Sequence, residues 1–577
     1  MPLPTKYTSL ISRDCPLAEY PRPQFVRDSY TSLNGRWQYM ICKDSESLGT
    51  DWKEILVPFP VGSLLSGVKD ILQEDETLYY RKHFFYAPQK ERTILHFEAV
   101  DQSAVVYLNG HCLGSHRGGY LPFTFDITAY LQSENELLLA VKDPSNHGDY
   151  AYGKQSLTPG GIFYTPIAGI WQSVWLEDLG KEAVEDVRYT IDYDHSRVSM
   201  DLCGDYQKVT VTVKEGEKTA AQIITSEKHI DLQLRDIHPW SCEDPFLYTV
   251  ELDTADDHVT SYFGMRCFSI EERKGQKVFC LNHQPVFLSG LLDQGYISDG
   301  IYTFPCEDAM EEELKTLKAS GFNMLRKHIK IENRRWYSLC DRLGILVFQD
   351  MPSGGSLKNP LAVSVQGMLG LKRKDEDPAS FGRKRKESQD AYYAEAEAMI
   401  DHLYNCVSVC AYVPFNEGWG QFKAKEAEAF FRRKDPSRLI DHASGWFDQG
   451  CGDFSSKHIY FRPYKLKPDK KGRAIFLSEF GGYAYVLDQH TDAEKAGGYR
   501  KFTSAAELSK ALQELYRRDI HDQIPKGLCG CVYTQVSDVE EECNGLYTYD
   551  RAVYKVPVET WKEINNELDE IFRKTYE

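Results

Sequence analysis

Two glutamates, Glu417 and Glu479, directly follow apolar runs that are typical of β-strands. A buried carboxylate without a partner is costly, so each position requires either a partner or a chemical task. Two facing carboxyl groups can divide the work of cleaving a glycosidic bond. One, kept protonated, donates to the leaving oxygen, and the other attacks the anomeric carbon. A single glutamate after a strand more often lies in the first turn of a helix, where the helix dipole favours a negative charge. Two such glutamates, both flanked by glycine, favour the catalytic interpretation.

The elements that would position these carboxylates begin after about residue 275, where apolar strands alternate with amphipathic helices. Helices are predicted over 308–319, 333–343 and 504–518, and a last one carries Trp561. Eight strands are predicted: Val286–Ser289, Asn323–Arg326, Ile345–Gln349, Val407–Val413, Leu439–His442, His458–Phe461, Ala474–Leu477 and Leu528–Thr534. Eight such units indicate a (β/α)8 TIM barrel, whose active site lies at the C-terminal ends of the strands.

Two β-rich regions precede the predicted barrel, which makes the chain a multidomain protein of mixed α and β class. Residues 1–179 contain short strands separated by turn signals, without a persistent helical period, and predict a β-sandwich. Residues 180–272 fit a small immunoglobulin-like sandwich, and residues 273–577 form the barrel. Within the barrel, the stretch 353–390 carries two basic runs and is expected to be a solvated loop and a candidate rim of the active site.

Composition excludes several other classes of protein. The net charge of −18 over 577 residues argues against a broad surface for nucleic acid or anionic membrane. No apolar run is long enough to span a bilayer, and residues 1–20 lack the apolar core of a secretory signal. The 15 cysteines show no zinc-binding spacing and fit reduced thiols. We therefore expect a cytoplasmic protein with neither a nucleic-acid nor a membrane partner.

At the level of motifs, the chain resembles glycoside hydrolase family 2, which contains β-galactosidases, β-glucuronidases and β-mannosidases. The motifs that carry the resemblance occur in order: Leu33-Asn-Gly-Arg-Trp37, Gly169-Ile-Trp-Gln-Ser-Val-Trp-Leu176, Asp244-Pro-Phe-Leu-Tyr248, Asn416-Glu417, Ser478-Glu479-Phe-Gly and Asn544-Gly-Leu-Tyr-Thr-Tyr-Asp550. The resemblance implies a jelly-roll sugar-binding domain, an immunoglobulin-like domain and a catalytic TIM barrel.

The resemblance also implies roles for the residues of the barrel. Glu417 is similar to the family's acid/base, and Glu479 to the nucleophile of a double displacement that retains the anomeric configuration. Asn416 is similar to the residue that hydrogen-bonds the sugar 2-hydroxyl. With these roles, the two carboxyl groups should lie about 5–5.5 Å apart.

Further substrate-binding candidates follow from the same comparison of motifs. Tyr460 matches a tyrosine that hydrogen-bonds the nucleophile, and Arg326 and His328 match a pair that holds the nucleophile and the sugar hydroxyls. Trp419 and Trp446, after strands four and five, are candidate platforms for a sugar ring. The alternatives are a barrel-capping role for Tyr460, a structural role for His328 and core packing for the tryptophans.

Departures from the family pattern narrow these expectations. Asp350, a candidate substrate contact, stands where many relatives carry glutamate, and Pro352 stands where magnesium-dependent β-galactosidases keep a histidine ligand. No metal and no cofactor are therefore predicted. Residues 542–547 lack the lysine with which β-glucuronidases read a sugar carboxylate, which disfavours a uronic acid unless a basic residue of 353–390 replaces it. Ser456 replaces the aspartate of a family Asp-x-His-x-Tyr element.

The sequence thus predicts a retaining exo-β-glycosidase that acts on small glycosides or oligosaccharides and is β-galactosidase-like in specificity. Within the same family, a β-glucuronidase, a β-galacturonidase and an α-L-arabinopyranosidase remain open alternatives. A non-catalytic carbohydrate-binding protein on the same fold is a further one, and loss of either glutamate would favour it. The resemblance also suggests a homo-oligomer.

Overall fold

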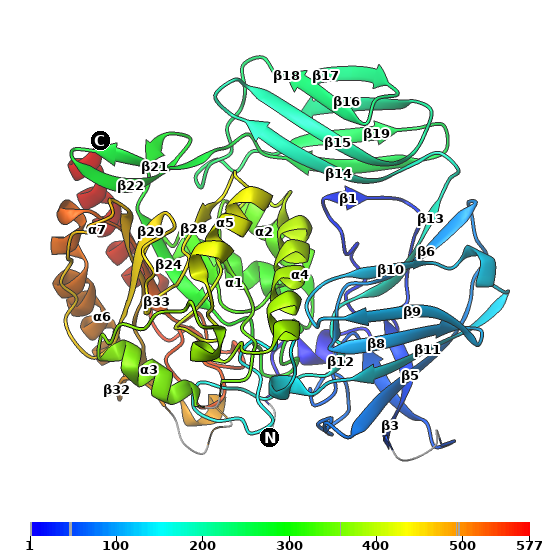
Figure 1. Cartoon of the computed structure of the whole chain (residues 1–577), viewed down its shortest axis with the longest axis horizontal. Coiled ribbons are helices and arrows are strands. Elements are labelled where there is room, and N and C mark those ends of the chain that lie inside the picture. The colour runs from blue at the N-terminus through cyan, green and yellow to red at the C-terminus, as the bar shows by residue number, and fades with distance from the viewer. Residues whose placement is uncertain (1–2, 45–48, 358, 492, 494–496) are drawn as a thin grey trace.

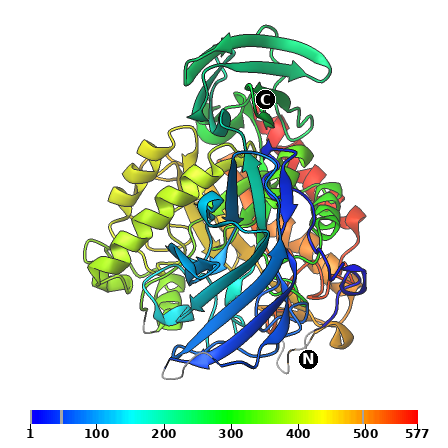
Figure 2. The same ribbon diagram turned by 90° about the vertical axis from the view of Figure 1, so that its right-hand side faces the viewer.

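The computed structural model describes residues 3–44, 49–357, 359–491, 493 and 497–577, and the statements below concern these residues. Three parts are visible in Figure 1: a β-sandwich in blue, a second β-sandwich in teal and a barrel coloured from green to red. The second sandwich projects from one end of the molecule, as the turned view in Figure 2 also shows. These parts confirm the predicted fold class of jelly-roll sandwich, immunoglobulin-like sandwich and TIM barrel.

The first sandwich packs a six-stranded sheet, in the order β4-β3-β5-β11-β8-β9, against a four-stranded sheet, in the order β10-β6-β13-β2. Its strands are β2 (Tyr30–Ser32), β3 (Gly35–Lys43), β4 (Lys53–Val57), β5 (Glu76–Phe85), β6 (Arg92–Phe97), β8 (Ser103–Leu108), β9 (His111–Arg117), β10 (Phe123–Asp126), β11 (Glu134–Lys142) and β13 (Val174–Leu179), with β7 (Val100–Asp101) paired to β12 (Gly169–Ile170). Alternate residues such as Leu137, Leu139 and Val141 of β11 are buried, as expected for strands with one face on a core.

The second sandwich consists of a five-stranded sheet, β1-β20-β19-β16-β17, and a three-stranded sheet, β14-β15-β18. Its strands are β1 (Phe25–Val26), β14 (Ala183–Asp192), β15 (Arg197–Asp205), β16 (Val209–Glu215), β17 (Lys218–Thr225), β18 (His229–Gln233), β19 (Tyr248–Asp253) and β20 (His258–Phe263). Strand β1 lies in the region that the sequence assigned to the first sandwich, but it pairs antiparallel with β20. A three-stranded sheet of β21 (Phe268–Arg273), β22 (Gln276–Leu281) and β23 (Gln284–Pro285) precedes the barrel.

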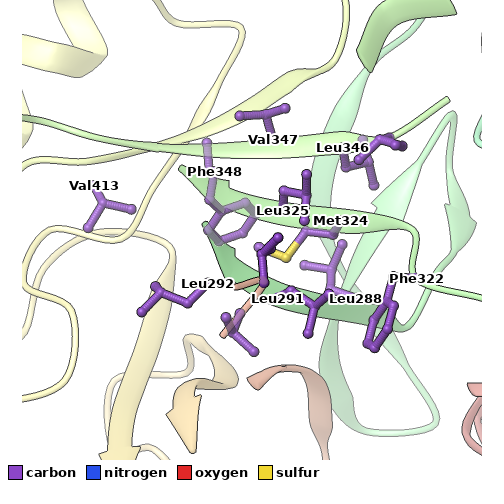
Figure 3. Packing of buried hydrophobic residues seen from close by; sticks show 14 of the residues in the cluster. Leu288, Leu291, Leu292, Phe322, Met324, Leu325, Leu346, Val347, Phe348 and Val413 are labelled. Carbon is purple, nitrogen blue, oxygen red and sulfur yellow. The ribbon is translucent and has the colours of Figure 1, made fainter. Parts of the chain in front are cut away.

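The barrel strands are parallel and run in the order β28-β27-β26-β25-β24-β33-β30-β29. They are β24 (Leu288–Asp293), β25 (Met324–Lys327), β26 (Leu346–Asp350), β27 (Val409–Val413), β28 (Leu439–Ile440), β29 (Phe454–Ile459), β30 (Ala474–Gly481) and β33 (Leu528–Thr534). Figure 3 shows Leu291, Leu325 and Phe348 of neighbouring strands in the packed core. Strand β29 begins four residues earlier than predicted, because Ser455 and Ser456 interrupt its apolar pattern, and Tyr460 lies just beyond its end.

The helices are α1 (Glu307–Ala319), α2 (Arg334–Leu343), α3 (Pro360–Met368), α4 (Lys386–Leu403), α5 (Ala424–Lys434), α6 (Ala505–Asp519) and α7 (Val558–Tyr576). The predicted cap of α6 is present, since the Ser504 side chain accepts from the Glu507 amide. The prediction of a solvated loop over 353–390 was wrong in part, because α3 and the start of α4 fall there. No helix in the described part of the chain is both long and apolar enough to cross a lipid bilayer.

The barrel has an open seam between β28 and β29, which are the two ends of its sheet. Residues 441–453 and 460–473, all described, contain no α-helix, so two of the eight expected βα units lack their helix. Short strands β31 (Tyr483–Tyr485) and β32 (Arg500–Phe502) pair beyond the end of β30. The seam therefore leaves the outer face of β29 without the helix that would usually cover it.

A loop of the first sandwich reaches the barrel. It spans residues 148–168, between the short helix η3 (Ser145–His147) and β12. The amides of Tyr152 and Gly153 both donate to the Ser353 carbonyl at 2.9 Å, and the Tyr164 hydroxyl donates to Glu542. This loop therefore brings side chains of the first sandwich to the C-terminal ends of the barrel strands.

Candidate active site

Glu417 is held at the mouth of the barrel by a tight turn after β27. Its φ of 51° lies in the left-handed region, which residues other than glycine rarely adopt. The next residue, Gly418, has a φ of 80°, and a Cβ there would lie within 3.0 Å of the rings of Phe447 and Phe381. The Glu417 amide donates to the Ser444 carbonyl at 3.0 Å, which ties the turn to the loop after β28. Such strained backbone positions concentrate at functional sites.

Glu479 lies within β30, and its carboxylate is held by two donors. Arg326 Nη1 lies 3.0 Å from Oε1, and the Tyr460 hydroxyl lies 2.5 Å from Oε2. Both contacts stabilise negative charge on the carboxylate, which is the state that a nucleophile needs. The structure therefore brings the predicted nucleophile together with the arginine and the tyrosine that were expected to hold it.

Arg326, fully buried on β25, connects the two sides of the site. Its Nε and Nη2 donate to the two carboxylate oxygens of Asp350, at 3.0 and 2.9 Å. Nη2 also donates to Asn416 Oδ1 at 2.9 Å. Burial lowers the pKa of Arg326, but the carboxylates of Asp350 and Glu479 raise it by more, so the guanidinium stays charged. One cation therefore fixes Asp350, Asn416 and Glu479 together.

His458 lies between the two glutamates. Its Nδ1 is 2.7 Å from Glu417 Oε1, and its Nε2 is 3.5 Å from Glu479 Oε1. Arg326 Nη1, which can only donate, lies 3.2 Å from Nε2, so Nε2 accepts and the ring proton is on Nδ1. Burial lowers the pKa of His458 to about 3, so the ring is neutral near neutral pH. His458 therefore donates from Nδ1 to Glu417.

The environment of Glu417 differs from that of Glu479. Burial raises the pKa of Glu417 to about 7, against the opposing positive charges of Lys154 and Arg326. A carboxyl group that titrates near neutrality can both deliver and accept a proton at physiological pH. Glu417 is therefore suited to acid/base chemistry, while the Glu479 carboxylate accepts hydrogen bonds from Arg326 and Tyr460.

The spacing of the two carboxylates favours one stereochemical course. One carboxylate oxygen of Glu417 lies within 4.8 Å of one of Glu479. Retaining glycosidases hold their carboxyl groups about 5–5.5 Å apart, whereas inverting enzymes need about 6.5–9.5 Å to admit a water molecule. This close approach leaves little room for a water molecule between the two oxygens and therefore favours the retaining arrangement.

Several polar atoms at the site are available to a ligand. Asn416 Nδ2 and Trp419 Nε1 are buried donors without a hydrogen-bond partner in the described part of the chain. Leaving such a donor unpaired costs about 1–3 kcal/mol, which an oxygen of a bound sugar would offset. His328 Nδ1 lies 2.9 Å from Asp350 Oδ2, and burial lowers the pKa of His328, so the neutral ring keeps Nε2 as an acceptor.

The two candidate aromatic platforms are both buried. Trp446 contacts His458 edge-on at 5.7 Å between ring centroids, and a Cβ at Gly367 of α3 would lie 2.4 Å from the indole. Trp419 lies 5.4 Å from the Phe163 ring, which comes from the loop of the first sandwich. Stacking of a sugar on either tryptophan stays a prediction.

Sequence reasoning missed Lys154, which the same loop delivers to the site. Its side chain is buried, with a residue exposure of 7%, and its ammonium lies 5.9 Å from the Trp419 ring centroid and 5.4 Å from that of Tyr164. No carboxylate of the described residues lies within ion-pair distance of it, although its charge lowers the pKa of Glu417. No spacing could reveal this contact, because the sequence assigns Lys154 to a different domain.

Tyr499 and Glu542 were also missed as neighbours of the site. Tyr499 stacks on Tyr460 with ring centroids 4.4 Å apart, and the charge of Glu542 raises the pKa of Glu417. Glu542 accepts a hydrogen bond from the Tyr164 hydroxyl, so it joins the loop of the first sandwich to the barrel.

One group of side chains at the site has the ligand types of a metal centre. Atoms of Glu417, His458 and Glu479 lie within 4.8 Å of one another. The Arg326 guanidinium, however, contacts both Glu479 Oε1 and His458 Nε2. A fixed positive charge in this position opposes a second cation. The prediction that catalysis uses no metal therefore stands as a prediction, with an electrostatic argument in its favour.

Family models match three segments of the chain. Residues 68–167 match the galactose-binding domain-like model of glycosyl hydrolases 2, residues 180–266 match the model of glycosyl hydrolases family 2, and residues 273–476 match the family 2 TIM barrel domain. The three models occur in the order of the three parts of the structure.

Individual relatives divide between two specificities. A beta-galactosidase from Clostridium acetobutylicum is 24% identical over 498 residues, covering 81% of this chain and 52% of the relative. A putative beta-glucuronidase from Formosa agariphila is 25% identical over 515 residues, covering 81% of this chain and 46% of the relative. The chain spans about half the length of these relatives.

Solved structures show the same fold over nearly the whole chain. A β-D-glucuronidase from Dictyoglomus thermophilum matches with a TM-score of 0.74 at 18% identity, covering 97% of this chain and 99% of its own. A β-galacturonidase from Eisenbergiella tayi matches with a TM-score of 0.69 at 17% identity, covering 96% of this chain and 99% of its own.

Proposed function

Because this chain belongs to glycosyl hydrolase family 2, we propose that it is a retaining exo-β-glycosidase that removes terminal sugars by double displacement. The observation that carries the proposal is the pair Glu417 and Glu479, which lie within 4.8 Å in contrasting environments. A retaining glycosidase needs this division between a proton donor and a nucleophile. A binding protein without catalysis would need neither the spacing nor the contrast.

In the first step, the Glu479 carboxylate attacks the anomeric carbon and forms a glycosyl ester. The bond between that carbon and the leaving oxygen breaks, and the proton of Glu417 passes to the leaving oxygen. Arg326 and Tyr460 fix the orientation of the Glu479 carboxylate for attack. Asn416, whose Oδ1 is held by Arg326, presents its free Nδ2 to the sugar 2-hydroxyl.

In the second step, the ionised Glu417 takes a proton from water as the water oxygen attacks the anomeric carbon. The ester bond to Glu479 breaks, so the sugar leaves with its original configuration and both glutamates return to their starting states. The hydrogen bond from His458 stabilises the ionised Glu417 between the two steps.

For the sugar, the first candidate is a neutral β-galactoside. Residues 542–547 lack a lysine that could read a sugar carboxylate. A beta-galactosidase is also among the relatives that the chain matches over most of its length.

A β-uronide is the second candidate, and Lys154 favours it. A buried ammonium that has no carboxylate partner among the described residues would gain most from an anionic group on the bound sugar. This cation comes from the first sandwich instead of the barrel segment 542–547, so the missing lysine of that segment does not exclude a uronic acid.

A panel of aryl glycosides tests both candidates. The aryl galactoside, glucuronide, galacturonide, mannoside and arabinopyranoside would be compared by kcat/KM for the natural chain and for Lys154→Met. Preference for a uronide that is lost in Lys154→Met supports the second candidate, and preference for the galactoside supports the first. Absence of hydrolysis of every glycoside would refute the proposed activity.

A further inference from the structure

Two basic segments that are far apart in the sequence meet at one pocket in the structure. The pocket has a volume of about 890 Å³ and is lined by residues of 367–374, 445–449 and 455–467. Seven basic side chains line it: Lys372, Arg373, Lys374, Lys457, Arg462, Lys465 and Lys467. In a chain of net charge −18, such a concentration of positive charge requires an explanation. We call this the cationic pocket.

The charges of the cationic pocket are not neutralised by neighbouring carboxylates. None of its seven basic side chains forms an ion pair within the described ranges. Elsewhere in those ranges ion pairs are common, for example Lys6–Glu312 and Lys574–Glu570. Asp448 is the one acidic side chain in the lining, and Arg473 already holds it at 2.8 Å. The cationic pocket therefore presents free positive charge to solvent or to a ligand.

The position of the pocket connects it with the candidate active site. It lies at β29, one of the two strands that border the open seam, and the C-terminal end of α3 forms its other side. Lys457 and His458 both line the pocket, and the ring of His458 also reaches Glu417. Trp446, which contacts His458 at 5.7 Å, also lines the pocket. A ligand that contacts His458 in the pocket would therefore be one side chain away from the proposed acid/base.

We propose that the cationic pocket binds anionic groups, carboxylate or sulfate, on the leaving-group side of the glycoside. The assignment to that side rests on the proposed function, because Glu417 must contact the leaving oxygen. The binding of anions itself rests only on the pocket and its charges. A local positive field of this kind would also attract an anionic glycan to a chain that repels it elsewhere.

The first test uses two fluorogenic glycosides of one sugar that differ in leaving-group charge: the neutral 4-methylumbelliferyl and the anionic 3-carboxyumbelliferyl glycoside. We expect kcat/KM to be about tenfold higher for the anionic substrate at low salt, and the ratio to fall as sodium chloride is added. In the variant Lys372→Gln, Lys374→Gln, Lys465→Gln, Lys467→Gln, whose changed side chains are exposed, the ratio should fall to about one.

The matched control removes four exposed lysines elsewhere: Lys69→Gln, Lys425→Gln, Lys510→Gln and Lys562→Gln. The overall charge is then the same as in the pocket variant, and the substrate ratio should stay at the natural value. A natural ratio near one, or an equal loss of the ratio in the control, would overturn the proposal.

The second test separates this proposal from the proposed function, because it measures binding affinity instead of a rate of hydrolysis. Calorimetric titrations would use a sulfated disaccharide, a uronate-containing disaccharide and inorganic sulfate. Binding of either disaccharide that is lost in the pocket variant supports the proposal, and the tighter one identifies the anion. Binding of neither, or binding no tighter than that of inorganic sulfate, would overturn it even if the chain hydrolyses neutral glycosides.

Discussion

The Nδ1 atom of His458 lies 2.7 Å from Oε1 of Glu417. The proton in this contact belongs to the ring, because Arg326 donates to the other ring nitrogen. The contact therefore stabilises the ionised form of Glu417, against a burial that favours the protonated form. Arg326 also holds Glu479, so a single hydrogen-bond network joins both carboxylates.

The pH dependence of catalysis should follow the titration of Glu417. Burial raises the pKa of Glu417 to about 7, and only its protonated form can protonate a leaving group. As pH rises through about 7, the proton is lost and kcat/KM for a poor leaving group should fall tenfold per pH unit. A pH profile that is flat from 6 to 9 would contradict this assignment.

Replacement of His458 should shift the basic limb of the pH profile, where activity falls with rising pH, to higher pH. In His458→Leu, the ionised Glu417 loses a hydrogen bond, so its pKa should rise by about one unit, and the basic limb should shift upward with it. In His458→Gln, which can still donate, the shift should be smaller. A limb that moves downward or stays in place in His458→Leu would show that the ring does not donate to Glu417.

Glu417→Gln should separate substrates by leaving group. Without a proton donor, hydrolysis of an alkyl or disaccharide substrate should fall by about 10²–10⁴-fold, whereas a dinitrophenyl glycoside should still form the glycosyl-enzyme rapidly. Azide should then restore turnover and yield a β-glycosyl azide, which product analysis by NMR would identify. An equal loss for both leaving groups would assign the acid to another residue.

Arg326→Met should destabilise the fold as well as impair catalysis. It leaves Asp350 and Glu479 buried without their shared cation, which should cost about 3–5 kcal/mol of unfolding free energy in urea titrations. The control Arg517→Met breaks an exposed pair with Glu567 and should change stability by about 0–1 kcal/mol. Equal effects of the two substitutions would contradict a structural role for the Arg326 network.

The barrel strands and the position of the two glutamates at their ends could be predicted because local sequence carries that information. Apolar runs of strand length mark the barrel strands, and the C-terminal ends of parallel strands must converge. Arg326, Asp350, Asn416 and Tyr460 therefore meet around Glu479 as their positions at strand ends predict.

Contacts between distant segments could not be predicted in the same way. Lys154 reaches the site through a loop of another domain, and Ser456, which breaks the family pattern, donates at 2.7 Å to Asp441 from the neighbouring strand end. Helix α3 lies in the segment 353–390, for which two basic runs predicted a solvated loop. Each of these features depends on tertiary packing, which no local periodicity encodes.

The measurement that tests the account most directly is trapping of the glycosyl-enzyme. A 2-deoxy-2-fluoro-β-glycoside with a dinitrophenyl leaving group should form a stable ester, because the fluorine slows its hydrolysis more than its formation. We predict that intact mass and peptide mapping will place one sugar on Glu479, and that Glu479→Gln will abolish the adduct. An adduct on another residue, or turnover that releases sugar of inverted configuration without an adduct, would contradict the retaining mechanism through Glu479.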